Sequence, residues 1–111
     1  MSSLSQAPVE IRPVRSIKEC DDFAVLEQMV WQAPPIDALP SHLTWTAIKN
    51  GGGLIAAFSP DGPAETGGMV GATFWFLGVD QATISGASGP LHVKACSQVA
   101  GVLPAWQGQR I

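Results

Sequence analysis

The chain has 111 residues, of which 46% are apolar and 14% are charged, and its formal net charge is −3. This length predicts one domain, because domains usually contain ~100–150 residues. The apolar content excludes a disordered chain. The charged fraction is below the ~25% that soluble domains average. We therefore expect that part of the surface is covered by something else, or that part of a larger fold is absent.

Several functional classes are excluded by what the sequence lacks. Its six basic residues are scattered, whereas a nucleic-acid surface needs clustered Lys and Arg. The longest apolar run, Met69 to Val79, is shorter than the ~20 residues of a membrane-spanning helix. No apolar signal segment is visible at the N-terminus. Cys20 and Cys96 lie in unlike contexts and predict neither a disulfide framework nor a metal site. We expect a cytoplasmic protein without nucleic-acid or membrane partners.

The first half of the domain is predicted to contain a strand and two helices. Residues 1–8 are expected to be disordered, and residues 9–111 to form the domain. A short or edge strand is predicted over residues 9–14, because Pro13 lacks an N–H. Ser16 and Glu19 have the spacing of a capping box. The apolar period that follows predicts a helix from Ile17 to Trp31, stopped by the prolines at 34 and 35.

The rest of the chain is predicted to add a short helix and three strands. Ser41 is expected to cap the second helix, which ends near Asn50 and Gly51. Strands are predicted over residues 54–58, 69–77 and 91–103, with a long loop over 78–90. The first of these is a continuous apolar run, which favours burial on both faces. The predicted order is strand, helix, helix, strand, strand, strand.

The C-terminal segment, VAGVLPAWQGQRI, carries the functional interpretation. A strand runs into a proline, an aromatic residue and a Gln-Gly turn. This resembles the fourth strand and phosphate loop of the GNAT superfamily of acyl-CoA-dependent N-acetyltransferases. The segments IRPVRSIKECDDF, SHLTWTAIKNGGGLIAAF and GVLPAWQGQRI look most like its predicted-acetyltransferase subgroup. The resemblance covers the chain from about Val9 onward. It implies an α/β fold with a mixed, mostly antiparallel sheet and two N-terminal helices, truncated after the fourth strand.

The resemblance also implies an activity and a cofactor site. The activity is transfer of an acetyl or other acyl group from coenzyme A to an amine, either a small molecule or a peptide. Val102 would direct its amide toward the thioester carbonyl. Gln107 matches the first position of the loop signature, and Gly108 and Gln109 occupy its two variable positions. Such a turn binds a diphosphate through backbone amides at the start of a helix, which requires small residues.

Two departures from the family pattern lead to the alternative interpretations. Arg110 stands where the family usually has a glycine, so its side chain would either contact phosphate or obstruct the turn. The sequence ends at Ile111, which predicts an N-terminal half-domain with an exposed sheet that forms homo-oligomers. The alternatives are a non-catalytic half-domain or remnant that associates with another chain, and a small-ligand or structural α/β protein.

No catalytic base is singled out by spacing. Asp21, Asp22 and Glu27 are expected on the solvated face of the first helix. His92 and Cys96 would lie ~13 Å apart along one strand, which is too far for a catalytic pair. The four tryptophans are expected in the core or at its edge, and Trp106, beside the loop, is the one to test. The available acids and bases are Glu27, Asp37, Glu65, Asp80, His42 and His92.

Overall fold

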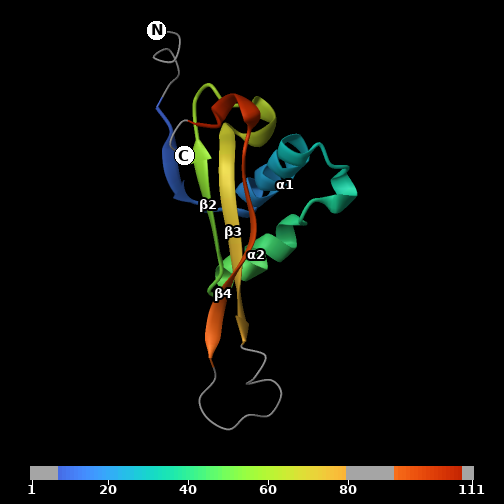
Figure 1. Ribbon diagram of the computed structural model, residues 1–111, viewed down its shortest axis with the longest axis vertical. Helices are drawn as coiled ribbons and strands as arrows, with labels where there is room; N and C mark the ends of the chain where they lie inside the picture. The colour runs from blue at the N-terminus through green and yellow to red at the C-terminus, as the bar shows by residue number, and fades with distance from the viewer. Residues whose placement is uncertain (1–7, 80–91, 109–111) are drawn as a thin grey trace.

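The computed structural model describes residues 8–79 and 92–108 as a four-stranded antiparallel sheet with two helices. The strands follow one another across the sheet in the order β1-β2-β3-β4, and both helices lie between β1 and β2 in the chain (Figure 1). The elements are β1 Glu10–Pro13, α1 Ile17–Trp31, α2 Ser41–Lys49, β2 Gly53–Phe58, β3 Met69–Val79 and β4 Val93–Val102, with the 3-10 turns η2 Pro35–Asp37, η3 Ala64–Thr66 and η4 Pro104–Trp106.

The predicted element order and the α/β class are confirmed, with small corrections at the strand ends. β3 continues to Val79 and β4 begins at Val93, because these two residues pair with each other across the hairpin. β1 is an edge strand of the described sheet, as Pro13 predicted. Three predictions fall largely outside the described residues: the disorder of residues 1–8, of which Pro8 alone is described, the loop over 78–90, and the site residues Gln109 and Arg110.

The capping box that starts α1 is confirmed in one of its two hydrogen bonds. The Ser16 Oγ accepts from the backbone N–H of Glu19 at 3.2 Å. The Glu19 carboxylate accepts instead from the N–H of Arg15 and from the Arg12 guanidinium, which ties the helix to β1. The helix ends at Trp31 and is capped by Gln32, which adopts a left-handed conformation with φ 51° and donates its backbone N–H to the Gln28 carbonyl. The helix is therefore terminated by its own cap before the prolines at 34 and 35.

The prediction that Ser41 caps α2 is wrong. Ser41 is the first helical residue, and Pro40 stands at the cap. The Pro40 carbonyl accepts from the N–H groups of Leu43 and Thr44, so the backbone closes the first turn without a side-chain cap. The hydroxyl of Thr44, which is fully buried, donates to the Ser41 carbonyl. A preceding proline is compatible with this start because it holds the chain extended before the helix.

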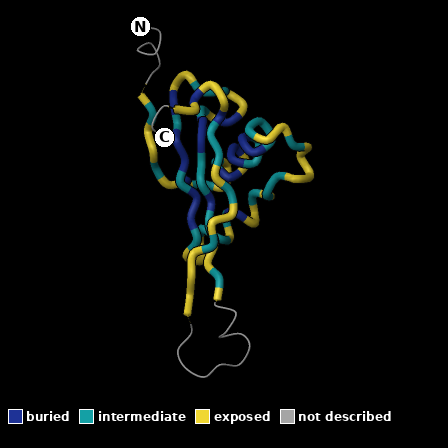
Figure 2. Tube along the Cα trace, viewed as in Figure 1, coloured by how far each residue is buried: buried dark blue, intermediate teal, exposed yellow. Residues whose placement is uncertain are grey.

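The two helices cover one face of the sheet, and the core lies between the helices and this face (Figures 1 and 2). Phe23 of α1 and Phe74 of β3 meet at its centre with ring centroids 6.3 Å apart. Burial of such side chains supplies the main stabilisation of a domain of this size. The largest fully buried side chains are Phe23, Leu26, Leu54, Met69, Val70, Thr44, Thr66 and Cys20.

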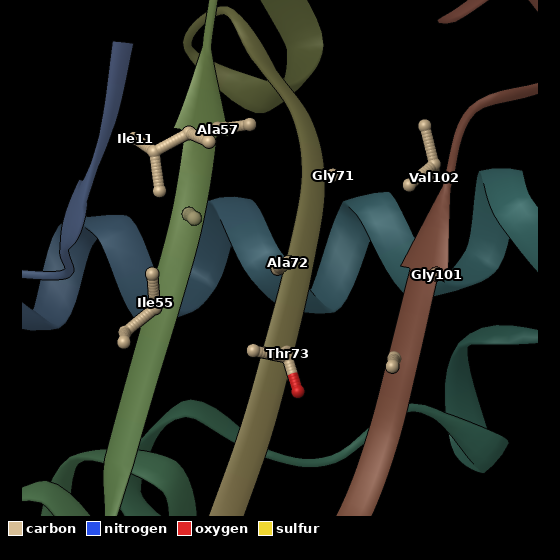
Figure 3. A pocket seen from close by; sticks show the side chains of 10 residues that line it. Ile11, Ile55, Ala57, Gly71, Ala72, Thr73, Gly101 and Val102 are labelled. Atoms are coloured by element: carbon tan, nitrogen blue, oxygen red, sulfur yellow. The ribbon is translucent and has the colours of Figure 1, made fainter. Parts of the chain in front are cut away.

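The opposite face of the sheet is not covered by α1 or α2 (Figure 3). A shallow hollow of about 190 Å³ runs over small residues of β3 and β4, and Ile11, Ile55 and Val102 border it. The predicted burial of β2 on both faces is thus only partly confirmed, since Ala57 is buried but Ile55 is half-buried. The expected self-association through this face stays a prediction.

Candidate functional site

The helix-covered side of β4 is shaped by a β-bulge. Phe74 of β3 pairs with Val99, but the next residue, Trp75, pairs with Ser97, so Gln98 is an extra residue in β4. A bulge redirects side chains and is common next to functional sites. Both Gln98 and Val99 line the same cleft here, although neighbouring residues of a regular strand would face opposite ways.

This cleft, of about 410 Å³, lies between the C-terminal part of α1, the connection between the helices (residues 32–40, which contains η2) and β4. We call it the β4 cleft. α1 contributes Glu27 and Trp31, the connection contributes Asp37, and small alanines leave the space between them. Its lining residues are Glu27, Trp31, Ala33, Asp37, Ala38, Gln98, Val99 and Ala100.

Glu27 is the buried carboxyl group of the β4 cleft, with only 7% of its surface exposed. Its Oε1 accepts a 3.0 Å hydrogen bond from the backbone N–H of Leu39, which belongs to the connection between the helices. Burial raises the pKa of the Glu27 carboxyl group, and the Leu39 hydrogen bond only partly offsets this. A carboxyl group whose pKa moves toward neutrality is suited to exchange protons or to pair with a bound cation.

The expectation that Asp21, Asp22 and Glu27 form a solvated face is therefore wrong for two of the three. Asp21 is exposed, but Asp22 and Glu27 are buried. Asp22 pairs with Lys18 at 2.7 Å. Glu27 is buried because the connection folds back over the helix. The sequence did contain a signal, since Glu27 follows the buried Phe23 by one helical turn and shares its side of α1.

Trp31 forms the other wall of the β4 cleft, and its ring lies against β4 where Gly101 has no side chain. A Cβ on Gly101 would stand 2.7 Å from the Trp31 Cη2 and 3.0 Å from the Val30 Cγ1. The ring therefore lies closely over the strand, where any larger residue would displace it. Trp31 remains 49% exposed, so part of its indole is accessible to a ligand. No pattern in the sequence marks Trp31 as a site residue, and the sequence pointed to Trp106 instead.

A second hollow, of about 360 Å³, adjoins the β4 cleft and shares Gln98 with it. We call it the apolar groove. It lies between α2 and the strands β3 and β4. Leu39 connects the two hollows, because its N–H donates to Glu27 and the residue also lines this groove. Its lining residues are Leu39, Leu43, Ala47, Phe74, Phe76 and Gln98.

The sequence-predicted cofactor residues lie at the end of β4. Val102 is the last residue of the strand, and the Gln107 Nε2 donates to its carbonyl at 3.1 Å. The N–H groups of Trp106 and Gln107 donate to Leu103 and Pro104 inside the turn. Gly108 has φ 83°, and a Cβ there would meet open space. The structure thus brings Val102 and Gln107 together and leaves Gly108 at the surface.

The remaining candidates do not join either site. Trp106 is buried, as expected for a core-edge residue. His42 on α2, Glu65 on η3 and His92, just before β4, are exposed, and Asp80 lies outside the described residues. Cys20 is buried, and burial raises the pKa of its thiol. Among residues 8–79 and 92–108, no three His, Cys, Asp or Glu side chains are grouped as metal ligands would be.

No protein-family model and no curated protein sequence matches the chain. Within the part of the chain that the structure describes, neither helix has the length and apolar character needed to cross a membrane.

Proposed function

We propose that the chain is a GNAT-type domain that transfers an acyl group from coenzyme A to an amine. The observation that carries the proposal is the bulged strand β4, which borders the β4 cleft on one side and runs into the turn at residues 104–108. A strand with a free edge can bind an extended ligand through its backbone, as the pantetheine arm would require. The order of the elements agrees with the resemblance.

The two substrates would meet near the C-terminal end of β4. Ala100 lines the β4 cleft, and Val102 follows two residues later, ~7 Å further along the strand. The amine would occupy the β4 cleft, and the thioester would lie beside Val102. Because the N–H groups of Trp106 and Gln107 already donate within the turn, the diphosphate would be held by other N–H groups of this segment, such as that of Gly108.

The proposed reaction is a direct transfer. The acceptor first loses its ammonium proton to water, and the neutral amine nitrogen then forms the new C–N bond to the acyl carbon as the C–S bond breaks. The sulfur leaves as a thiolate and takes up the proton that the nitrogen loses, which yields an amide and the free thiol of coenzyme A. Holding both substrates in this geometry supplies much of the rate, since it replaces a bimolecular encounter.

Thermal unfolding of the full chain with acetyl-CoA tests the proposal. Binding to the folded state raises the melting temperature, by an amount that grows with ligand concentration. S-acetylpantetheine, which lacks the diphosphate, is the matched ligand and should bind at least about tenfold more weakly if backbone amides hold the diphosphate. The absence of a shift with millimolar acetyl-CoA would overturn the proposal for this chain.

A variant in the turn locates the cofactor site. Gly108→Val places a β-branched residue at φ 83° without a steric contact, so it distorts the turn without touching the core. We expect the acetyl-CoA shift to disappear while the melting temperature without ligand changes little. An unchanged acetyl-CoA shift in this variant would show that the turn is not the cofactor site.

A further inference from the structure

The Glu27 carboxyl group is buried without a cationic partner in the described structure. The ion pairs of residues 8–79 and 92–108 join Arg12 to Glu10 and Glu19, and Lys18 to Asp22. Among the described residues, the Glu27 carboxyl group has one hydrogen-bond partner, the N–H of Leu39. A buried carboxylate without a counter-charge is costly, and proteins usually keep such a group for a ligand or for catalysis. The missing partner of Glu27 is thus expected to come from a bound molecule.

The other walls of the β4 cleft also favour a cation. The half-exposed indole of Trp31 offers a π face, and aromatic faces attract ammonium groups. Asp37, which is exposed, adds a second carboxylate at the cleft. The contributions come from different elements, α1 and η2. An anionic ligand group would meet two carboxylates here and is disfavoured.

The apolar groove indicates what the cation is attached to. Leu43 and Phe76 are 48% and 38% exposed there, although both are large apolar side chains. An apolar group that fills the groove would cover them and gain the corresponding hydrophobic free energy. The groove meets the β4 cleft at Gln98, so one molecule can occupy both.

We propose that the β4 cleft and the apolar groove together bind a primary amine carried on an apolar body, such as a phenylalkylamine, and that Glu27 pairs with its ammonium group. Trp31, held in place by Gly101, forms the second contact of the ammonium group. The inference rests on the proposed function in one respect, namely that this amine is the acyl acceptor. The binding itself needs no coenzyme A.

Calorimetric titration of the full chain with 4-phenylbutylamine and with 4-phenylbutanol, at pH 8 and without acyl-CoA, tests the proposal. Only the amine carries a charge, and hydrogen bonds to charged groups are worth enough for at least about tenfold tighter binding. We expect Glu27→Gln to remove this preference while binding of the alcohol persists, which also shows that the variant is folded. Equal binding of both compounds by the wild type, or a preserved preference in the variant, would overturn the assignment.

Matched variants separate the contributions of the two hollows. Asp21→Asn changes an exposed carboxylate of α1 outside the cleft and should leave the preference intact. Leu43→Ala should weaken both compounds about equally, whereas Ile36→Ala, at an 89% exposed residue, should weaken neither. If Asp37→Asn removes the preference and Glu27→Gln does not, the assignment to Glu27 is wrong.

Amine binding without acetyl-CoA binding would contradict the proposed transferase function and leave the proposed amine site unaffected.

Discussion

The indole of Trp75 on β3 lies directly over Gly53, its cross-strand partner on β2. A Cβ on Gly53 would overlap the ring atoms Cη2 and Cζ2. The ring covers the backbone of Gly53, which is buried. An aromatic ring over a strand glycine compensates for the packing that glycine cannot provide.

This relationship predicts a change of sign in a double-mutant cycle. Gly53→Ala in the wild-type chain should lower the free energy of unfolding by about 1–3 kcal/mol, because the new methyl group displaces the indole. In a Trp75→Ala background the same substitution should be neutral or stabilising by about 0.5–1 kcal/mol, because alanine is the better strand residue. Urea unfolding of the four proteins measures the coupling. Equal changes in the free energy of unfolding in both backgrounds would show that Gly53 and Trp75 are not energetically coupled.

The ion pair between Arg12 and Glu19 predicts a loss of stability in acid. The Arg12 hydrogen bonds lower the pKa of Glu19 more than its burial raises it. A lowered pKa in the folded state means that the contribution is present above the ordinary pKa of glutamate and is lost as the pH falls through the folded-state pKa. Glu19→Gln should therefore cost about 1–2 kcal/mol at pH 7 and much less at pH 3.

Unfolding by urea at pH 7 and pH 3 checks this pH dependence. Glu10→Gln is the matched control, because Glu10 approaches the same guanidinium at 3.5 Å but its side chain is 69% exposed. It should cost less than about 0.5 kcal/mol at both pH values. Equal losses for the two variants at pH 7 would contradict the special role of Glu19.

Glu27 predicts the opposite pH dependence. Its pKa is raised by burial, so it favours the folded state below the ordinary pKa of glutamate, and this contribution is lost as the pH rises through the raised folded-state pKa. Glu27→Gln should therefore stabilise the protein by about 1 kcal/mol at pH 8 and have little effect at pH 4. Asp21→Asn, at an exposed carboxylate of the same helix, should show no such difference. A destabilised Glu27→Gln protein at pH 8 would be inconsistent with a buried, unpaired carboxylate.

The two cysteines should differ in their reactivity with a disulfide reagent. Cys20 is fully buried and its pKa is raised, whereas Cys96 on β4 is half-buried. In the native protein one thiol per chain should react readily, and Cys96→Ser should remove that reaction. The second thiol should react only on unfolding, because a buried protonated thiol is a poor nucleophile. Rapid reaction of both thiols in native buffer would contradict the burial of Cys20.

Most of the local structure could be predicted from the sequence. The Ser16 cap and the apolar period determine α1 from Ile17 to Trp31, since both signals act within a few residues. Apolar runs separated by proline and glycine determine the number and order of the strands for the same reason.

The candidate site depended on tertiary structure. Glu27 acts as a buried carboxyl group only because Leu39, twelve residues away, folds over it. The bulge at Gln98 follows from the pairing of β4 with β3 rather than from a local signal in the strand. Local propensities determine where helices and strands form, whereas burial and pairing depend on residues distant in the chain, and these long-range contacts assemble the cleft.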